Sequence, residues 1–518
     1  IEAGIIYALN DMVDSGHVYV PLQDLMELST DLLGVDSTLI ETGIDRLAVQ
    51  DRIRKEQING DENYGSDGAQ KTSDQYIENE TAIYLTPFYY AETGAARLIG
   101  KLLYNPVEPK QDLLLQISEN LSQEQKAALD KALASPVSVI TGGPGTGKTT
   151  CLKALVQLLD ANNIKYALAS PTGRAAKRLS QATGRKASTI HRLLAYHPSE
   201  GFKHHENNPL AIQFLVVDET SMLDLLLAYN LLRALKPGTQ VLFVGDVDQL
   251  PSVGAGDVLR DIIDSGSVPV SRLNKIYRQE EDSKIISNAH RINQGQLPDF
   301  SSTKRGDFYL FPADNAIKAA DWIVDLVSSR LPETFGFNPI TDIQVLSPLY
   351  RGDAGVDALN IRLQAKLNPA QKGKTEQKLA GRVFRVGDKV MQVRNNYDKN
   401  VFNGDIGIIE SIELEVQAFI VSMDDGRVIN YDFAEGDEIV HAFAVSVHKS
   451  QGNEYPAVVM PVITQHYIML QRNLIYTAVT RAEKSCVLVG NNKAIRIAIN
   501  NNDIEKRFSH LQERIRSQ

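Results

Sequence analysis

The sequence predicts an α/β fold, in which a parallel-sheet core carries a small β-barrel insertion and follows a helix-rich N-terminal domain. Three observations predict it. From Leu121 onward, apolar strands alternate with helices in the rhythm of a parallel sheet. One of these strands runs directly into a glycine-rich loop that opens a helix. Residues 381–440 interrupt the rhythm with an apolar alternation of period two.

The bulk composition is that of a multidomain globular protein. At 518 residues the chain is too long for a single core, and its length favours roughly three or four domains. Hydrophobic residues make up 43% and charged residues 23%, and no apolar run reaches the roughly eighteen residues of a membrane span. The two cysteines, Cys151 and Cys486, match no metal or redox spacing, so we expect a cytoplasmic protein without disulfides or membrane contact.

Residues 1–114 are expected to form a helix-rich, winged-helix-like domain. Short helical patterns alternate there with two strand-like runs, "GHVYVP" and "AIYLTPFYY", which the polar stretch "NGDENYGSDGAQKTSD" separates. The chain opens on Ile1 inside an amphipathic pattern without a preceding cap, so we expect a fragment of a longer protein. The stretch "YNPVEPK" predicts a linker to the parallel-sheet core.

The all-β insertion at 381–440 is expected to be a small barrel. Its apolar residues alternate with polar ones, and the pairs Asn403-Gly404 and Asp425-Gly426 predict tight hairpin turns. After the insertion, the strand–helix pattern resumes at "AFAVSVHKSQG". The barrel therefore interrupts an α/β domain that continues on both sides of it.

The net charge of −10 argues at first against a nucleic-acid partner, but the charge is unevenly distributed. Residues 1–114 hold 20 Asp and Glu against 8 Lys and Arg. Residues 161–192, in contrast, carry seven Lys and Arg and no acidic residue. A strip of this kind neutralises phosphates, although a solvated helix face would have the same composition. Charge alone leaves both interpretations open.

A phosphate-binding loop is the most specific motif in the chain. In "VSVITGGPGTGKTT" an apolar strand leads into the pattern Gly-x-x-x-x-Gly-Lys-Thr and then into a helix. The backbone amides of such a loop surround phosphates, Lys148 reaches the terminal phosphates and the Thr149 hydroxyl ligates magnesium. We therefore expect Mg²⁺ and a nucleoside triphosphate held by Gly143, Pro144, Gly145, Thr146, Gly147, Lys148, Thr149 and Thr150.

Four further polar residues complete the expected nucleotide site. The buried strand "IQFLVV" ends at Asp218, which can hold the magnesium shell, and Glu219, which can activate the attacking water. Gln249 follows another apolar strand at the same sheet edge and can touch the γ-phosphate. Gln125, before the phosphate-binding loop, can pair with N6 and N7 of adenine and so favour ATP. A loop or helix-surface glutamine is the alternative for both amides.

With these motifs in order, the chain resembles the superfamily 1 helicases, and specifically the RecD-like ATP-dependent DNA helicases, over residues 121–490. The matching stretches are "LSQEQ", "GGPGTGKTT", "SPTGRAAKRL", "STIHRLL", "VVDETSM", "VGDVDQLPSVGAG", "YRQ", "VLSPLYRG", "VHKSQGNEY" and "YTAVTRA". The resemblance implies a P-loop NTPase with two RecA-like lobes and an SH3-like barrel at 381–440. It places the first lobe at 115–300 and the second at 301–380 and 441–518.

The resemblance also gives a role to Arg481. This arginine follows the helical pattern "LIYTAVT" with no acidic partner one turn earlier, and alone it would be a surface arginine in a salt bridge. The resemblance implies instead an arginine finger that reaches the nucleotide from the far lobe, with Arg278 in "YRQ" as a second one. Both would neutralise charge that develops on the γ-phosphate, beside Lys148, Glu219 and Gln249.

Single-stranded DNA is the partner that the resemblance implies. Its channel would be lined by Pro171, Thr172, Arg174, Thr189, His191, Arg192, His448 and Ser450. The basic strip contains most of these residues, so charge and resemblance agree, although a core histidine is the alternative for His191. Residues 195–210 contain Pro, Gly and Asn-Asn-Pro punctuation and predict a projecting hairpin, the pin that meets a duplex fork in this family. A mobile surface loop is the alternative.

The sequence therefore predicts an ATP- and Mg²⁺-dependent DNA helicase, a monomeric motor that moves on single-stranded DNA in repair or recombination. Only the resemblance implies its 5′ to 3′ polarity. Two alternatives stay open: a DNA-stimulated ATPase or clamp that does not unwind, and the helicase portion of a larger nuclease or relaxase assembly. The presence of Lys148, Glu219, Gln249 and both arginines argues against an inactive motor, but not against a translocase that does not unwind.

Overall fold

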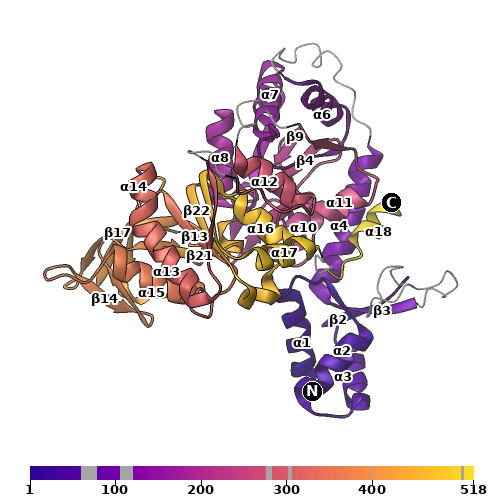
Figure 1. The fold of residues 1–518 in the computed structure, drawn as a ribbon. Helices are drawn as coiled ribbons and strands as arrows, with labels where there is room; N and C mark the ends of the chain where they lie inside the picture. The colour runs from indigo at the N-terminus through magenta and orange to yellow at the C-terminus, as the bar shows by residue number, and fades with distance from the viewer. Residues whose placement is uncertain (60–78, 106–120, 276–282, 302–305, 397, 503–506) are drawn as a thin grey trace.

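The computed structural model describes residues 1–59, 79–105, 121–275, 283–301, 306–396, 398–502 and 507–518. It consists of a small N-terminal domain, two lobes built on parallel sheets, and an antiparallel insertion at the far side of the second lobe (Figure 1). No helix in these ranges has both the length and the apolar character that a bilayer span requires.

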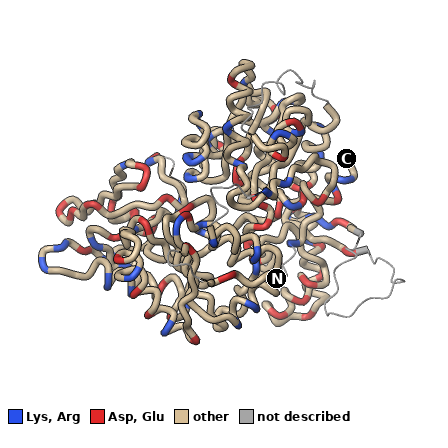
Figure 2. The backbone as a smooth tube through the Cα atoms, turned by 45° about the horizontal axis from the view of Figure 1, so that its top comes forward, with Lys and Arg blue, Asp and Glu red and all other residues tan. Residues whose placement is uncertain are grey.

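The N-terminal domain combines three helices with an antiparallel sheet whose strands pair in the order β1-β3-β2. The helices enclose a core that includes Ile5, Leu25 and Ile44. In Figure 2, acidic positions predominate around the N-terminus, in agreement with the composition of this region. The elements are α1 (Glu2–Asp14), β1 (Tyr19–Pro21), α2 (Leu22–Leu33), α3 (Ser37–Val49), β2 (Ile53–Asn59) and β3 (Asn79–Leu85).

A long helix, α4 (Thr86–Tyr104), connects this domain to the first lobe. The prediction that "AIYLTPFYY" is a single strand is wrong, because β3 ends at Leu85 and the second half of the run begins α4. Pro87 explains the difference, since its fixed φ suits the first turn of a helix and its missing N–H weakens a strand. Most of the expected linker at 104–110 lies outside the described residues.

The first lobe is a six-stranded parallel sheet in the order β11-β4-β10-β9-β5-β6, with a separate apolar core on each face. Successive residues of β9 alternate between these cores: Leu215 packs beside α10 and α11, and Val216 beside α6 and α7. Because both faces are covered, the strands are apolar throughout, as the sequence predicts. The elements are α6 (Gln123–Ala134), β4 (Val137–Gly142), α7 (Lys148–Ala161), β5 (Tyr166–Ser170), α8 (Gly173–Thr183), β6 (Ala187–Thr189), α9 (Ile190–Leu193), β7 (Tyr196–His197), β8 (Gly201–Phe202), β9 (Phe214–Val217), α10 (Leu225–Arg233), β10 (Gln240–Gly245), α11 (Val258–Asp264) and β11 (Val270–Leu273).

The second lobe is a five-stranded parallel sheet in the order β12-β23-β22-β13-β21. Its core takes in α12 through Ile285, Ala289 and Ile292, although we expected this lobe to begin only at 301. The helical spacing of these three residues gives α12 the apolar face that is buried here. The elements are α12 (Lys284–Asn293), β12 (Phe308–Pro312), α13 (Ala316–Asp325), a π-helical turn (Leu326–Arg330), α14 (Leu331–Phe335), β13 (Ile343–Ser347), α15 (Val356–Leu367), β21 (Ala444–Ser446), β22 (Tyr455–Val462), α16 (Arg472–Val479), β23 (Ala482–Gly490) and α17 (Asn492–Asn500).

The insertion is a five-stranded antiparallel sheet in the order β19-β18-β17-β16-β20, with a separate hairpin of β14 and β15. Both predicted turns are present, and their glycines, Gly404 and Gly426, adopt φ values of 92° and 84° that other residues reach only with strain. Phe419 and Tyr431 stack in the core with ring centroids 5.0 Å apart. The elements are β14 (Glu376–Leu379), β15 (Arg382–Arg385), β16 (Lys389–Gln392), β17 (Ile406–Glu413), β18 (Ala418–Met423), β19 (Val428–Asp432) and β20 (Ile439–His441).

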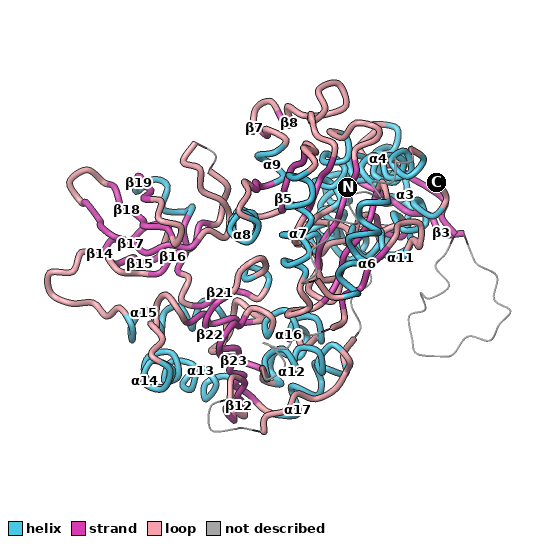
Figure 3. The backbone as a smooth tube through the Cα atoms, turned by 90° about the horizontal axis from the view of Figure 1, so that it is seen from above, coloured by secondary structure: helices cyan, strands magenta, loops and turns pink. Residues whose placement is uncertain are grey.

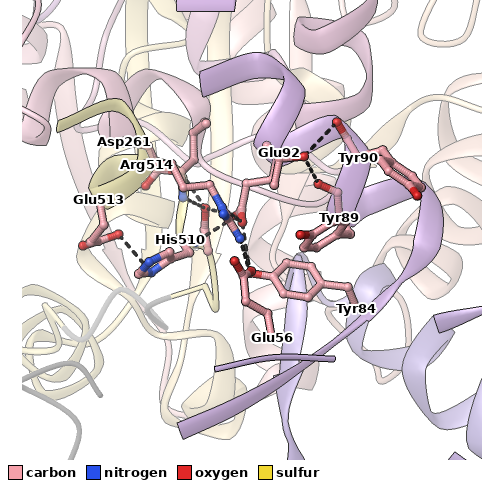
Figure 4. A network of polar contacts seen from close by, with 12 residues as sticks. Glu56, Tyr84, Tyr89, Tyr90, Glu92, Asp261, His510, Glu513 and Arg514 are labelled. Atoms are coloured by element: carbon pink, nitrogen blue, oxygen red, sulfur yellow. Dashed lines mark hydrogen bonds and ion pairs between the residues drawn. The ribbon is translucent and has the colours of Figure 1, made fainter. Parts of the chain in front are cut away.

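The C-terminal helix α18 (Leu511–Arg516) returns to the first lobe and lies against α4 and α11 (Figure 1), although we expected the chain to end in the second lobe. The fully buried Glu92 of α4 accepts hydrogen bonds there from the backbone N–H of His510 at 2.8 Å and from Arg514 Nε at 2.9 Å (Figure 4). The Tyr84 hydroxyl also donates to Glu92, and Arg514 forms a second ion pair with Glu56 of β2. This network joins the N-terminal domain, α4 and the C-terminal helix.

Replacing Arg514 with methionine should lower the apparent Tm of the protein by several degrees. The substitution leaves the Glu92 carboxylate buried without its ion-pair partner, which costs on the order of 3 kcal/mol. Differential scanning calorimetry would measure the change. Glu513→Gln on the same helix is the matched control, because the Glu513 side chain is 39% exposed and its pairing with His510 contributes little. An unchanged Tm for the Arg514 variant would show that the network does not stabilise the fold.

Candidate active site and nucleic-acid path

A cavity of about 770 Å³ lies between the two lobes, and we call it the nucleotide cavity. The first lobe contributes the predicted phosphate-binding loop and the residues that follow three of its strands. The second lobe contributes the segment after α16 and part of the segment before β22. The lining residues that the argument uses are Gly143–Thr150, Arg178, Asp218, Glu219, Asp246, Gln249, Glu454, Thr480 and Arg481.

The phosphate-binding loop has the geometry that the motif predicts. It connects the end of β4 to the start of α7, and Gly145 and Gly147 adopt φ values of 72° and 85°. The Lys148 ammonium group donates to the carbonyl oxygens of Gly142 and Gly143, at 2.5 and 3.0 Å. The lysine is thereby held over the loop, at the start of a helix whose free N–H groups favour an anion.

Asp218 and Glu219 follow β9 directly and both line the nucleotide cavity. Burial and the neighbouring Glu219 carboxylate raise the pKa of Asp218 to about 7. Glu219 itself has a φ of 52°, a left-handed backbone conformation that costs a residue with a side chain of order 1 kcal/mol. With this conformation, two successive carboxylates line the same cavity. Backbone strain of this kind is common at functional sites.

The residues expected to hold Mg²⁺ fit that ion chemically. Thr149 offers a hydroxyl oxygen and Asp218 a carboxylate oxygen on the wall of one cavity. Mg²⁺ prefers oxygen ligands and commonly takes only one or two from the protein, with the rest from phosphates and water. In the described ranges, no group of three or more His, Cys, Asp and Glu is arranged to hold a metal ion.

Arg481 lies at the cavity wall but is almost entirely buried, with 3% of its surface exposed. Arg481 lies two residues after Val479, the last residue of α16, and is therefore not inside that helix. Its Nη2 donates to Gln249 Oε1 at 2.8 Å, and its other N–H groups donate to the carbonyl oxygens of Thr477 and Asn453. No carboxylate in the described part of the chain lies within ion-pair distance of it. The alternative of a surface salt bridge is therefore wrong.

Asp246 extends the contact between the lobes. Its Oδ2 accepts hydrogen bonds from Gln249 Nε2 at 3.0 Å and from the Tyr476 hydroxyl of the second lobe at 2.8 Å. Burial raises the pKa of Asp246 above its ordinary value. The Tyr476 hydroxyl also borders the phosphate-binding loop, since a Cβ on Gly143 would lie 2.9 Å from it. Arg481, Gln249, Asp246 and Tyr476 thus form one hydrogen-bonded series across the cleft.

One predicted site residue, Gln125, is not brought to the nucleotide cavity. Gln125 is 2% exposed, and its Oε1 accepts a hydrogen bond from the Ser122 N–H at 3.0 Å in the capping box that starts α6. It is neither on the cavity wall nor on the helix surface, so the structure does not place it to contact adenine. Arg278, the expected second arginine finger, lies outside the described residues.

Some of the expected DNA-contacting residues share a second cavity of about 460 Å³, which we call the channel cavity. Thr172 and Arg174 reach it from the start of α8, and His448 and Lys449 reach it from the second lobe. Burial, and the nearby Arg507 guanidinium, lower the pKa of His448. The channel cavity is therefore lined from both lobes, as the nucleotide cavity is.

Two further basic residues of the strip, Lys177 and Arg192, face the barrel across a third cavity of about 350 Å³. Lys177, Thr189 and Arg192 line it on the first lobe, and Asp405, Asp424 and Asp425 line it on the barrel. Arg174 forms an ion pair with Asp424, and the Arg192 guanidinium lies 5.8 Å from the centre of the Phe402 ring. Figure 3 shows the same arrangement, with α8 between the first-lobe sheet and the barrel. Acidic barrel residues thus face the basic residues of the first lobe across this cavity.

Three expected DNA contacts lie on none of these cavity walls. His191 packs against the rings of Tyr196 and Phe202, with centroid distances of 5.5 and 5.7 Å, and burial lowers its pKa. Ser450 is fully buried and donates to the Val447 carbonyl at 2.6 Å. Pro171 precedes α8 without lining a cavity. For His191, the core-histidine alternative agrees better with the structure.

The expected pin contains a short hairpin of β7 and β8, which lies at the outer edge of the first lobe (Figure 3). Its tip, Pro198–Glu200, is exposed. The following segment is fixed to the lobe by Glu206, which accepts two hydrogen bonds from Arg233 of α10, both at 2.8 Å. The segment is thus a hairpin with an anchored base.

Comparison with known proteins identifies the family. Three family models match the chain: an AAA domain at residues 120–308, an ATP-dependent RecD-like DNA helicase SH3 domain at 359–423 and a UvrD-like helicase C-terminal domain at 441–489. The chain is 34% identical to the ATP-dependent RecD2 DNA helicase of Deinococcus radiodurans, in an alignment that covers 100% of this chain and 69% of that protein. The chain belongs to the RecD-like ATP-dependent DNA helicase family.

Other relatives of this helicase include RecD subunits. The RecBCD enzyme subunit RecD of Mycolicibacterium smegmatis is 32% identical, over 76% of this helicase and 75% of the subunit. Among solved structures, Bacteroides Pif1 bound to ssDNA shares 21% identity over 72% of this chain and 92% of that one, with a TM-score of 0.44. The predicted fold class and the predicted ATP-dependent DNA helicase activity are confirmed by the family assignment, and the protein is therefore an enzyme that hydrolyses ATP.

Sequence reasoning missed four residues that the structure places at the nucleotide cavity or its border. Asp246 and Glu454 stand inside the quoted motifs "VGDVDQLPSVGAG" and "VHKSQGNEY", and their positions beside Gln249 and Ser450 could have indicated them. Tyr476 precedes Arg481 in "YTAVTRA". Arg178 had a weaker signal, its spacing of one helical turn from Arg174 in "SPTGRAAKRL".

Proposed function

We propose that this helicase moves 5′ to 3′ along single-stranded DNA and separates a duplex ahead of it in DNA repair or recombination. The main support for a motor function is the nucleotide cavity, to which both lobes contribute charged residues. A nucleotide bound there would contact both lobes, so its hydrolysis can change how the lobes sit relative to each other. The polarity and the biological process rest on resemblance to the RecD-like family.

The nucleotide chemistry assigns one role to each residue. Lys148 and the loop amides bind the phosphates of ATP, and Glu219 orients and deprotonates the attacking water. Gln249 contacts the terminal phosphate or this water and reports its state to Arg481. Arg481 neutralises the charge that develops on the transferred phosphoryl group, a role that Arg278 shares in this proposal. Mg²⁺, held by Thr149 and Asp218, would neutralise phosphate charge when bound.

The DNA path runs along the channel cavity and the start of α8. Thr172, Arg174, His448 and Lys449 face one another there from the two lobes, and Lys177 and Arg192 continue the basic surface toward the barrel. Single-stranded DNA binds such grooves mainly through its phosphates. To bind Arg174, the DNA must displace the Asp424 carboxylate that now pairs with it. Thr189 continues the path along the third cavity, whereas Pro171, His191 and Ser450, which line none of the cavities, are given no DNA contact in this proposal.

Replacing Arg174, Lys177 and Arg192 with alanine should weaken single-stranded DNA binding whatever the base sequence. Each lost phosphate contact should also reduce the slope of log K against log salt by about 0.7. Fluorescence anisotropy titrations between roughly 50 and 200 mM salt would measure both effects.

A matched control is available within the basic strip. Lys165, Arg185 and Lys186 carry the same charge but line none of the three cavities, so their triple alanine variant should keep the wild-type slope. Asp424→Asn should act in the opposite direction and tighten DNA binding, because it removes the competitor for Arg174. Equal slopes for the two triple variants would mean that DNA does not follow the proposed path.

A second function, that of a subunit in a larger nuclease assembly, is favoured by the RecD subunits among its relatives. Those matches cover 76–81% of this chain, whereas the helicase match covers all of it, including the N-terminal domain. This difference favours similarity to a helicase over similarity to a nuclease subunit. We propose that the motor works alone, as a cytoplasmic monomer. We propose a division into an N-terminal domain to residue 114, a first lobe to about 283, and a second lobe with its SH3-like barrel.

The proposal is tested by strand displacement on duplexes with either a 5′ or a 3′ single-stranded tail. With ATP and Mg²⁺, the helicase should open the 5′-tailed duplex and not the 3′-tailed one, and Glu219→Gln should open neither. If the helicase opened only the 3′-tailed duplex, its polarity would be 3′ to 5′ and the proposed polarity would be wrong. Copurification with large nuclease subunits would favour the assembly.

A further inference from the structure

Two chain segments run from the channel cavity to the nucleotide cavity, one in each lobe. The first is the N-terminal half of α8, from Thr172 in the channel cavity to Arg178 in the nucleotide cavity. The second leads from His448 in the channel cavity to Glu454 in the nucleotide cavity. Each segment therefore has one end beside the DNA path and one end beside the nucleotide.

The ends at the nucleotide cavity meet across the cleft. Arg178 Nη2 forms an ion pair with Glu454 Oε1, and Arg178 Nη1 lies 3.9 Å from Glu219 Oε1. One guanidinium is thus shared between the second lobe and the carboxylate that we assign to water activation. The two segments are also in close contact nearer the DNA path, because a Cβ on Gly452, between the channel-cavity residues Gln451 and Asn453, would lie 3.0 Å from Thr172 Oγ1.

The Arg178–Glu454 pair is unlike an ordinary surface ion pair. The side chains are 39% and 36% exposed, so their attraction adds little to the stability of the fold. Their exposure is toward a cavity that holds the proposed reaction, and the pair sets where the guanidinium lies relative to Glu219. The pair can therefore serve to position Arg178 beside Glu219, the carboxylate assigned to water activation.

Helix α8 is a physical connection between the two sites, because it contributes residues to both cavities. Arg174 and Arg178 are four residues apart on α8, so they stand one turn apart on the same face. DNA that draws Arg174 away from Asp424 would pull on the start of this packed helix, and a shift of the helix would carry Arg178 with it. At the nucleotide cavity, Arg178 could then change how closely it pairs with Glu219 and with Glu454. Both residues of the Arg178–Glu454 pair belong to segments that reach the DNA path, so DNA can act on this pairing from either lobe.

We infer that Arg178 is a positioning residue for DNA-stimulated ATP hydrolysis, and that its pairing with Glu454 makes the orientation of Glu219 depend on DNA. This inference rests on the proposed role of Glu219 and on the proposed DNA path. It goes beyond them because it names the contact through which the two sites communicate.

The test compares kcat and KM for ATP with and without saturating single-stranded DNA in Arg178→Ala, Arg178→Lys and Glu454→Gln. Arg178→Ala should lower the DNA stimulation factor, the ratio of the two kcat values, at least tenfold, while the Kd for single-stranded DNA stays within threefold. Arg178→Lys, which keeps the charge, should recover part of the stimulation. The double variant Arg178→Ala with Glu454→Gln should stimulate no less than the worse single variant, since both remove the same contact.

Two results would overturn the inference: a wild-type stimulation factor in Arg178→Ala, or an equal fall of kcat with and without DNA. Arg185→Ala is the matched control, because Arg185 follows the same helix, pairs with Asp160 and lines neither cavity. Glu219→Gln in the same assay separates this inference from the proposed function. If Glu219→Gln hydrolyses ATP at the wild-type rate, the assignment of Glu219 is wrong whatever Arg178 does.

Discussion

Replacing Arg481 with alanine should lower DNA-stimulated ATP turnover by about a thousandfold or more and leave ATP binding nearly unchanged. Arg481 is a buried cation that bonds only to neutral oxygens, at the wall of the cavity that also holds the phosphate-binding loop. A charge held in this way is available for the negative charge that grows during phosphoryl transfer. Because this charge develops after ATP has bound, the loss should fall on kcat.

Steady-state ATPase measurements with saturating single-stranded DNA, together with fluorescent-nucleotide binding, would separate the two effects. Lys484→Ala is the control, because Lys484 lies on β23 near Arg481 but is exposed and outside the cavity lining. Arg481 also donates to the Asn453 and Thr477 carbonyls, so the Tm of the variant must be checked against the wild type. Wild-type turnover in a folded Arg481→Ala variant would remove the arginine-finger role.

Replacing residues 197–201 with two glycines should abolish duplex separation and spare DNA-stimulated ATPase and movement on single strands. The exchange removes the exposed tip of the hairpin and keeps Glu206, whose bonds to Arg233 fix the segment to the first lobe. A wedge is needed because each base-pair step that opens costs about 1.4 kcal/mol of stacking, and the displaced strand must be held apart. The hairpin takes no part in the nucleotide cavity, so hydrolysis should continue.

Strand displacement and ATPase assays on the same preparation would test the pin. The control is a two-glycine replacement of 414–416, the turn between β17 and β18, which is exposed and lines none of the three cavities. Full unwinding by the hairpin variant would mean that the segment is a surface loop.

The sequence was most informative where the chemistry is local. The phosphate-binding loop, the carboxylates after β9 and the glycine turns of the barrel each depend on a few adjacent residues, and the structure contains them as predicted. Strands that are covered on both faces can also be recognised in the sequence, because they are apolar throughout. Helix limits were less certain, as the run that Pro87 divides between β3 and α4 shows.

Contacts between distant segments could not be predicted from the sequence. The Arg174–Asp424 and Arg178–Glu454 pairs join residues 250 and 276 positions apart, and no local pattern indicates which partner a surface arginine will find. Gln125 shows that a local contact can also be missed. We expected its side chain to bind adenine, but it accepts a hydrogen bond in the capping box that starts its own helix. The return of α18 to the first lobe depends on Glu92, a buried acid that pattern alone would place at the surface.

Displacement of streptavidin from biotinylated single-stranded oligonucleotides is the most direct test of the central claim, that ATP hydrolysis between the two lobes moves this helicase along DNA. With ATP and Mg²⁺, the wild-type protein should release streptavidin from the 3′ end and not from the 5′ end, and Arg481→Ala should release none. Full DNA-stimulated ATPase without release from either end would contradict the claim and identify a DNA-bound clamp.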